Sequence, residues 1–238
     1  MAYLARQDIL YPGAIFHITW QCHNEEWLLK DNSLKQLYYD LLLKYKDRYG
    51  VEFYSYCLMH NHPHLTGKTF AADSISKLMQ TVNSQLAKAI NKRYERKGQA
   101  IMDRFKSPII QTDNQLLKVM NYNDLNITRT KAKIHPKDYN WCSYRYYAYG
   151  EPDPLITISP SYLTLGDTDE QRQSEYRRMV EEVIKNEALK KRDYSKTLYI
   201  GDPGWVKARY EEINEIKQAK RLAYLARQRR MMYMRSPP

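Results

Sequence analysis

Three of the six histidines in the 238-residue chain lie within one short segment, His60-Asn61-His62-Pro63-His64. Residues two apart in an extended segment point to the same side, so the side chains of His62 and His64 are expected to converge. Two converging neutral imidazoles can bind one divalent ion. The same spacing also suits surface histidines in a turn, or one ligand beside one packing residue, and the pair alone leaves these alternatives open.

The positive charge of the chain is concentrated in two blocks. The sequence has 38 Lys and Arg residues against 27 Asp and Glu residues, which gives a formal net charge of +11. Residues 77–106 include eight basic and two acidic residues, and residues 217–238 include seven basic residues and no acidic one. Because these blocks account for the whole excess, the rest of the chain is nearly neutral. This pattern indicates a polyanionic partner.

The composition excludes several classes of protein. A hydrophobic share of 43% excludes a chain that is disordered throughout. The longest apolar runs, such as 41–43, are far shorter than the roughly 20 residues that cross a bilayer. The first 13 residues lack the apolar core of a signal peptide. The three widely spaced cysteines argue against a disulfide framework or a cysteine zinc site, so we expect a cytoplasmic protein without a membrane partner.

Hydrophobic periodicity predicts the order strand, helix, strand, strand, helix, strand, helix. The short link between the second and third strands requires them to pair antiparallel. This is the order of a ferredoxin-like α+β domain, in which helices cover one face of an antiparallel sheet. The expected strands are 14–21, 51–59, 64–70 and 105–111, and the expected helices are 31–50, 73–98 and one that begins at 113.

The C-terminal part of the chain has a different character. Residues 171–191 and 205–230 are highly charged and have helical patterns. A boundary near Gly166 divides the chain into an expected α+β domain, 1–165, and an expected helical extension with a basic tail, 166–238.

Six segments resemble, in the same order, the motifs of REP-associated tyrosine transposases, which are single-tyrosine members of the HUH endonuclease superfamily. Cys57–Leu65, CLMHNHPHL, is similar to the family signature MPNHxHL. Matches in order are more specific than any one motif, and these extend over roughly residues 1–165. The other segments are 11–19 (YPGAIFHIT), 91–98 (NKRYERKG), 103–107 (DRFKS), 122–126 (YNDLN) and 141–145 (WCSYR).

The resemblance implies that a tyrosine hydroxyl attacks a phosphodiester of single-stranded DNA, leaving a 5′-phosphotyrosyl link and a free 3′-hydroxyl. By match to the motifs, Tyr122 is the nucleophile, and His62 and His64 hold a metal ion that polarises the phosphate. Related transposases place an amide ligand four residues after the tyrosine, which makes Asn126 the candidate third ligand. Such a site suits Mg²⁺ or Mn²⁺. Without the resemblance, a tyrosine on a helix that faces a sheet is more often a core residue.

Basic side chains of both blocks are implied to bind DNA. Those of the first block are expected near the active face, where phosphate contacts give salt-dependent affinity. The tail is interpreted as an amphipathic helix along a DNA hairpin, with a disordered basic arm or a membrane-surface helix as alternatives. The predicted DNA contacts are Lys88, Lys92, Arg93, Arg96, Lys97, Arg104, Lys106, Arg227, Arg229 and Arg230.

The leading hypothesis is a metal-dependent endonuclease and strand transferase that acts on single-stranded and hairpin DNA as a monomer or homodimer. A domesticated, non-catalytic nucleic-acid hairpin binder is the first alternative. A zinc hydrolase built on His60, His62 and His64 is the second, although no HExxH or HxHxDH pattern is present. The chain departs from the family pattern, without losing a catalytic group, at Gln21, His60, Pro63, Ile127 and Thr130.

Overall fold

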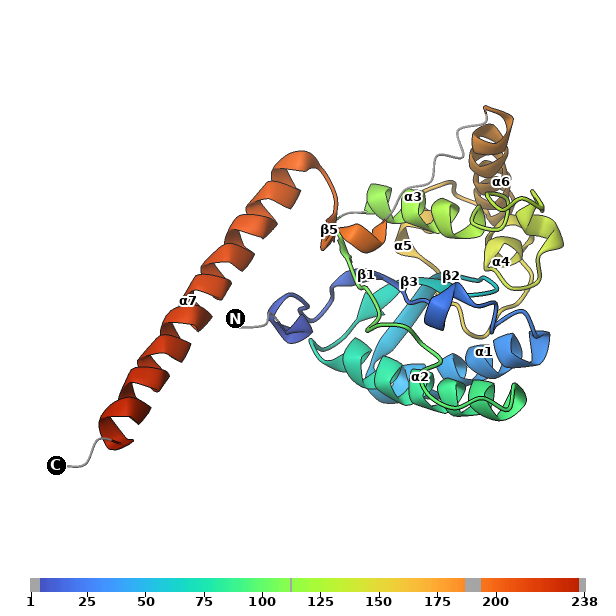
Figure 1. Cartoon of the computed structure of the whole chain (residues 1–238). Helices are drawn as coiled ribbons and strands as arrows, with labels where there is room; N and C mark the ends of the chain where they lie inside the picture. Colours follow the sequence, from blue (N-terminus) through green and yellow to red (C-terminus); the bar gives the residue numbers. More distant parts are fainter. Residues whose placement is uncertain (1–4, 112, 187–193, 236–238) are drawn as a thin grey trace.

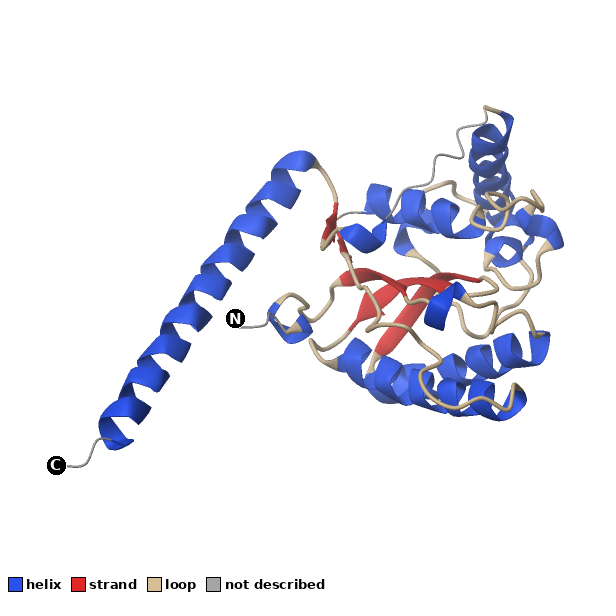
Figure 2. Cartoon of the chain, viewed as in Figure 1, coloured by secondary structure: helices blue, strands red, loops and turns tan. Residues whose placement is uncertain are grey.

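The computed structural model describes residues 5–111, 113–186 and 194–235 (Figure 1). This part of the chain folds around a five-stranded sheet in the order β2-β3-β1-β4-β5 (Figure 2). Strand β1 pairs antiparallel with β3 and β4, and β2 pairs antiparallel with β3, whereas β4 and β5 are parallel. The strands are β1 (Ile15–Thr19), β2 (Val51–Leu58), β3 (Pro63–Thr69), β4 (Ile109–Ile110) and β5 (Tyr199–Ile200). The first four lie within the expected segments apart from Pro63, and β5 was not expected.

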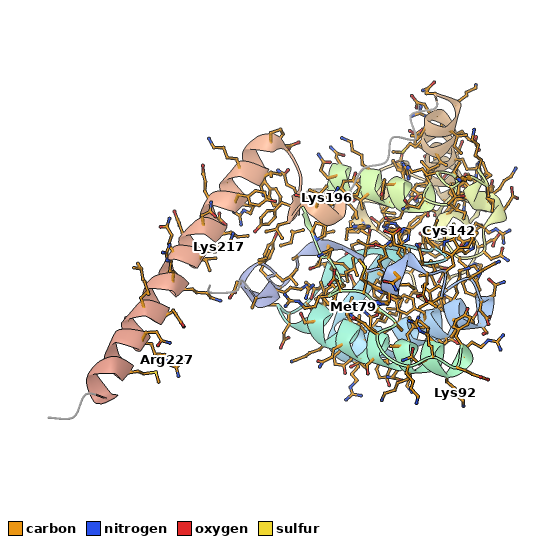
Figure 3. The ribbon with its side chains drawn as sticks, in the orientation of Figure 1. Met79, Lys92, Cys142, Lys196, Lys217 and Arg227 are labelled. Atoms are coloured by element: carbon orange, nitrogen blue, oxygen red, sulfur yellow. The ribbon has the colours of Figure 1, made fainter. Side chains whose placement is uncertain are left out.

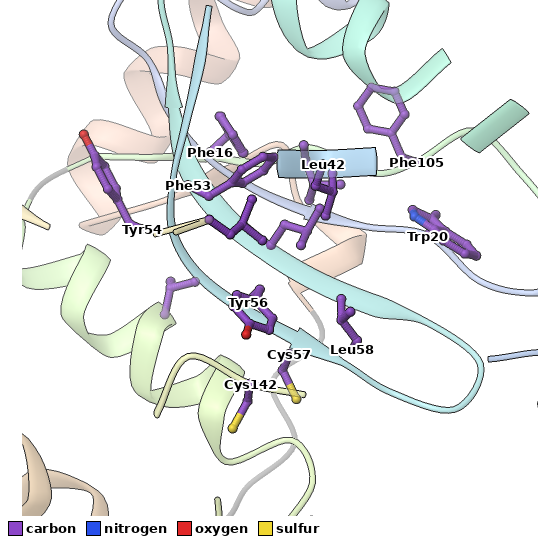
Figure 4. Close-up of a cluster of buried hydrophobic side chains, with 14 of the residues drawn as sticks. Phe16, Trp20, Leu42, Phe53, Tyr54, Tyr56, Cys57, Leu58, Phe105 and Cys142 are labelled. Atoms are coloured by element: carbon purple, nitrogen blue, oxygen red, sulfur yellow. The ribbon is translucent and has the colours of Figure 1, made fainter. Parts of the chain in front are cut away.

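Helices α1 (Asn32–Lys46) and α2 (Ser74–Arg93) cover one face of the sheet (Figure 1). The carboxylate of Asp31 caps α1 by accepting a hydrogen bond from the backbone N–H of Ser33 at 2.8 Å. Every second residue of the strands faces these helices, and the apolar side chains among them form a buried layer between sheet and helices. In this layer the rings of Phe16 and Phe53 pack edge to face with centroids 6.3 Å apart (Figure 4). This apolar layer is the helical cover that the sequence predicts.

Helix α3 (Asp113–Asp124) lies over the opposite face of the sheet (Figure 1). The strand residues on this face are largely polar. The register places His17 beside Thr66 and Thr19 beside His64, and Ser55 of β2 lies beside Thr66 on its other side. The α+β class is therefore confirmed, but the helices are not confined to one face.

Short helices and one longer helix complete the body around α3. Helix α6 packs against α4, and both contribute to a buried cluster of tyrosine rings, in which Tyr147 and Tyr176 have centroids 5.3 Å apart. This cluster accounts for part of the unusual tyrosine content as core packing. These helices are α4 (Tyr144–Tyr149), α5 (Pro160–Leu163) and α6 (Asp169–Lys185), and the 3₁₀ helices are η1 (Arg6–Asp8), η2 (His23–Glu25), η3 (Asp47–Tyr49), η4 (Pro136–Asp138) and η5 (Tyr194–Lys196).

Helix α7 (Pro203–Arg235) extends away from the body (Figure 1). Its basic side chains include Lys217 and Arg227, which are labelled in Figure 3. Strand β5, just before α7, completes the sheet, and Tyr176, Ile200 and Ile213 are buried. Residues after 166 thus contribute to the core, and the functional division at 166 stays a prediction. No described helix is long and apolar enough to cross a membrane.

Lys35 of α1 is a charged side chain in the core, only 1% exposed. Its ammonium lies 5.7 Å from the ring centre of Tyr139 and 5.8 Å from that of Trp141. Burial lowers the pKa of Lys35 to about 8. The two aromatic faces therefore compensate only part of the cost of burying the charge.

We predict that Lys35→Met stabilises the protein at pH 7, on the order of 1–3 kcal/mol, because it removes a buried charge. The pKa of Lys35 is lower in the folded chain than in the unfolded one, so the wild-type protein gains stability as the pH rises from about 8 towards 10. The gap between the two proteins should therefore narrow over this range.

Urea unfolding at pH 7 and pH 9.5 measures this gap. The control is Lys44→Met, which removes an exposed lysine from the same helix and should change stability little at either pH. A Lys35→Met protein that is less stable than the wild type at pH 7 contradicts the interpretation.

Candidate functional site

A cavity of about 460 Å³ lies where α3 meets the polar face of the sheet. Its wall includes His17 and Thr19 of β1, His64 of β3 and Tyr122 of α3. The rest of the wall comes from side chains of several loops and of the segment after α3: Trp20, Gln21, Glu25, Met59, His62, Met102, Asp103, Arg104, Lys106, Asn126, Arg129, Thr130 and Tyr194. Elements that are far apart in the sequence therefore meet at this cavity.

The His-x-His pair converges on this cavity as the spacing predicts. The rings of His62 and His64 have centroids 4.8 Å apart, and both line the cavity. His60 does not line it; its ring packs against Trp27 instead, at 5.4 Å. His60 is therefore separated from the pair, and burial lowers the pKa of its imidazole.

Tyr122 lies in the last turn of α3 and is 7% exposed. Its ring centre is 5.7 Å from that of His64. The guanidinium of Arg129 lies 4.4 Å from the centre of the Tyr122 ring and donates a hydrogen bond of 2.8 Å to the Tyr122 carbonyl. The phenol is thus held between an imidazole and a cation.

Asn126 follows one turn after Tyr122 and also lines the cavity. Its side chain is buried, and the Nδ2 atom has no hydrogen-bond partner among the described residues. A buried amide without a partner costs free energy, about 1–3 kcal/mol. The NH₂ group is therefore available to donate a hydrogen bond to an acceptor in the cavity.

His17 and Tyr194 line the cavity, although neither is among the site residues that the sequence predicts. The Nε2 of His17 lies 3.1 Å from the Nδ1 of His64. Burial lowers the pKa of His17 to about 3, so its imidazole is neutral. The ring of Tyr194 is centred 4.8 Å from that of Tyr122. Only strand alternation could have indicated His17, and no local pattern could have indicated Tyr194.

Arg104 and Lys106 line the cavity, as expected of residues near an active face, and they also line a smaller cavity of about 160 Å³. Arg6, which the sequence did not indicate, forms part of this smaller cavity. Its guanidinium stacks 3.6 Å from the ring centre of Phe105, and burial together with Arg104 lowers its pKa to about 10. Two arginines that repel each other in this way form a suitable site for a phosphate.

The expectation that the whole first basic block lies near the active face is wrong for α2. This helix covers the other face of the sheet, where Figure 3 labels Lys92. Lys88, Lys92 and Arg93 do not line the cavity. A charge pattern marks the exposed side of a helix but not which sheet face that helix covers. Their role in DNA binding stays a prediction.

Several of the remaining predicted DNA contacts already have other partners or lie apart from the cavity. Arg93 forms an ion pair with Asp31 at 2.7 Å, and Arg96 forms one with Glu26 at 3.1 Å. Lys97, just after α2, is exposed. Arg227 is exposed on α7, and the side chains of Arg229 and Arg230 lie outside those that the structure describes.

The cavity brings together two imidazoles and one amide that could bind a divalent ion. Within the described residues, no group of three His, Cys, Asp or Glu side chains is placed to hold a metal ion. The three-histidine site of the zinc hydrolase alternative is therefore not formed. Two imidazoles, the Oδ1 oxygen of the Asn126 amide and water would give a mixed nitrogen and oxygen ligand set, which is compatible with Mg²⁺ or Mn²⁺.

The end of α3 that carries Tyr122 is anchored by a buried carboxylate. Asp124 accepts hydrogen bonds from the hydroxyl of Tyr176 at 2.6 Å and from that of Ser143 at 3.2 Å. Burial raises the pKa of Asp124 to about 7, and these two hydroxyls oppose the rise. Helices α4 and α6 thereby fix the position of α3.

Comparisons with known proteins agree with the motif resemblance. Residues 11–122 match the model of the family described as "Transposase IS200 like". The structure is similar to that of a REP-associated tyrosine transposase bound to a REP hairpin, with a TM-score of 0.52 and 15% sequence identity. The similarity covers 66% of this chain and 92% of that one. No curated protein matches the sequence. The resemblance and the fold class are thus confirmed.

We predict that Tyr176→Phe lowers the free energy of unfolding by about 1–3 kcal/mol, because it leaves the buried Asp124 with one donor fewer. Chemical denaturation at pH 7.5 measures the loss. Tyr224→Phe, which removes an exposed hydroxyl from α7, is the control and should change stability by less than about 0.5 kcal/mol. Equal stability of the two variants would show that the hydroxyl does not anchor α3.

Proposed function

We propose that this chain, whose residues 11–122 match the IS200-like transposase family, is a metal-dependent single-strand DNA endonuclease and strand transferase that recognises hairpin DNA. The observation that supports the proposal is the shared cavity of Tyr122, His62, His64 and Asn126. It combines a nucleophile with a donor set for a divalent ion, and two basic side chains, Arg104 and Lys106, line the same wall.

In the proposed reaction, the hydroxyl oxygen of Tyr122 attacks the phosphorus of a phosphodiester in single-stranded DNA. A bond forms between that oxygen and phosphorus, and the bond from phosphorus to the 3′-oxygen breaks. The 3′-oxygen gains one proton while the phenol loses one, so no other reactant is consumed. The products are a 5′-phosphotyrosyl link and a 3′-hydroxyl, and attack on that link by another 3′-hydroxyl transfers the strand.

The side chains around Tyr122 have separate roles in this proposal. The guanidinium of Arg129, next to the Tyr122 ring, stabilises negative charge that develops on the phenol oxygen and the phosphate. Arg104 and Lys106 bind phosphates of the strand, and Arg6 extends this basic surface into the smaller cavity. His62, His64 and Asn126 would hold Mg²⁺ or Mn²⁺, which when bound polarises the phosphate.

The hairpin substrate is proposed from the structural neighbour and from α7. The similar solved structure is that of a transposase bound to a REP hairpin. In this chain, Lys220 of α7 pairs with Asp8 at 2.5 Å, which ties the helix to the N-terminal segment beside the basic cavity of Arg6. The basic residues that follow Lys220 on α7 could then lie along the duplex stem next to the strand being cut.

We predict that Tyr122→Phe abolishes formation of a covalent adduct between the protein and a labelled strand with a hairpin. The control is Tyr194→Phe, because its ring packs against that of Tyr122 in the same cavity and is the obvious rival nucleophile. This variant should still form the adduct. Denaturing gels of reactions with Mn²⁺ detect the covalent product.

The same assay separates the proposal from its alternatives. A Tyr122→Phe protein that still forms the adduct excludes Tyr122 as the nucleophile. A chain that binds the hairpin tightly but forms no adduct with Mg²⁺ or Mn²⁺ is a non-catalytic hairpin binder. His62→Ala combined with His64→Ala should abolish the adduct, and normal cleavage by this variant would rule out the metal pair.

We predict that deletion of residues 217–238 weakens hairpin binding and makes it less dependent on salt, because the segment has seven basic residues. Each phosphate contact contributes about 0.9 to the slope of the logarithm of the binding constant against the logarithm of the salt concentration. Cleavage at saturating DNA should be unchanged, since the cavity is formed without this segment. Fluorescence anisotropy at several salt concentrations measures the slope. Loss of cleavage at saturating DNA would contradict a role in affinity alone.

A further inference from the structure

Each imidazole of the His62–His64 pair is held by a hydrogen bond at its Nδ1 atom. The Nδ1 of His62 lies 2.6 Å from the Oδ1 of Asn61. The Nδ1 of His64 lies 3.1 Å from the Nε2 of His17. A neutral imidazole has one N–H and one lone pair, and the bond made by one nitrogen decides which of the two is available to a metal ion.

The hydrogen bond between His62 and Asn61 can form in only one direction, with His62 as the donor. The Nδ2 of Asn61 donates a hydrogen bond of 3.2 Å to the backbone carbonyl of Glu25. A carbonyl oxygen only accepts, so the NH₂ group of Asn61 faces Glu25 and its Oδ1 faces His62. The Nδ1 of His62 must therefore carry the proton, and the Nε2 on the other edge of the ring has the lone pair.

The hydrogen bond between His64 and His17 can run in either direction, and the position of the proton on His17 decides which. The Nδ2 of Asn123 donates to the Ser55 hydroxyl at 2.9 Å and to the Thr66 hydroxyl at 2.8 Å. These bonds leave the Oδ1 of Asn123 and the Nδ1 of His17 as buried atoms without a hydrogen-bond partner among the described residues. In the proposed arrangement the proton of His17 is on Nδ1, and its Nε2 accepts from the Nδ1–H of His64.

We propose that Asn61 and the His17–Asn123 pair are positioning residues that fix His62 and His64 as Nδ1–H tautomers, so that both Nε2 lone pairs serve one divalent ion. Without these bonds, the protons would distribute over both nitrogens, and fewer molecules would have both rings ready to bind. His17 of β1 and Asn123 of α3 are both buried, so the residues that would select the tautomer of His64 belong to the core of the domain. This inference rests on the proposed function only for the role of the bound ion, which is to polarise the phosphate of the DNA strand.

The two bonds also orient the rings. Partners of this kind hold the ring plane and raise the basicity of the ligand nitrogen, and their removal typically weakens metal binding about 10- to 100-fold. Asn61 belongs to the loop before β3, whereas His17 lies on the neighbouring strand β1. The two imidazoles are thus held by residues of two different elements that are not themselves ligands.

Nitrogen-15 NMR of the metal-free, DNA-free wild-type protein tests the proposal. Long-range ¹⁵N–¹H correlation spectra distinguish the two neutral tautomers, and assignment uses the single variants His62→Ala and His64→Ala. The expected result is protonated Nδ1 and unprotonated Nε2 in both rings at pH 8. An Nε2–H tautomer in either ring overturns the proposal.

Mn²⁺ titrations followed by the electron paramagnetic resonance of the free ion provide a second readout. His17→Leu and Asn61→Ala should each weaken binding about 10- to 100-fold. His17→Gln and Asn61→Asp keep an acceptor for the Nδ1–H and should restore much of the affinity. His60→Ala, which removes a neighbouring histidine outside the cavity, is the matched control and should bind as the wild type does.

The two outcomes of the titration are distinct from those of the DNA assays. Equal Mn²⁺ binding by wild type, His17→Leu and Asn61→Ala overturns the proposal, including the case in which none of them binds. If His17→Leu fails to fold, the partly exposed Asn61 still decides the matter. The Mn²⁺ titration contains no DNA, so its result is valid even if the chain forms no covalent adduct with DNA. Conversely, finding the other histidine tautomer does not affect the result of the adduct assay.

Discussion

The hydrogen bonds of the buried Asn123 amide determine how α3 lies on the sheet. Its NH₂ group donates to hydroxyls on two adjacent strands, Ser55 of β2 and Thr66 of β3. A buried amide that loses its partners costs about 1–3 kcal/mol, so rotation or sliding of α3 is opposed. The neighbours of Asn123 are fixed with it: Tyr122 against the ring of His64, and Asp124 beneath the hydroxyl of Tyr176.

The alternation of side chains along the strands lets one sheet serve two purposes. Leu65 faces the apolar layer under α1 and α2, while His64 and Thr66 on either side of it face α3. A shift of β3 by one residue would bury the histidine among apolar side chains and expose the leucine to the cavity. Gly67 resists such a shift, because a Cβ there would come within 1.9 Å of the Glu52 backbone oxygen. The register that builds the core therefore also builds the site.

Local sequence patterns were sufficient to predict the elements that carry the candidate site. They could not predict contacts between residues that are far apart in the sequence. Period-two and helical patterns indicated β1 to β3 and α1 to α3, and the His-x-His spacing indicated that His62 and His64 converge. The two-residue strand β5 is too short to show a period, and Tyr194 reaches Tyr122 across 72 positions of sequence. The sheet face covered by α2 depends on the packing of the whole domain, so its lysines were placed wrongly. The assignment of roles to Tyr122, His62, His64 and Asn126 came from the motif resemblance, and these roles remain proposals.

Identification of the residue that joins DNA tests this account most directly. The wild-type chain is incubated with Mn²⁺ and a single strand that bears a hairpin, the covalent product is digested with trypsin and nuclease, and the modified peptide is sequenced by mass spectrometry. The account predicts a nucleotide phosphate on Tyr122, within the peptide that follows Lys118 and ends at Arg129. A phosphate on Tyr194 or on any other residue, or hairpin binding with no modified peptide, would contradict it.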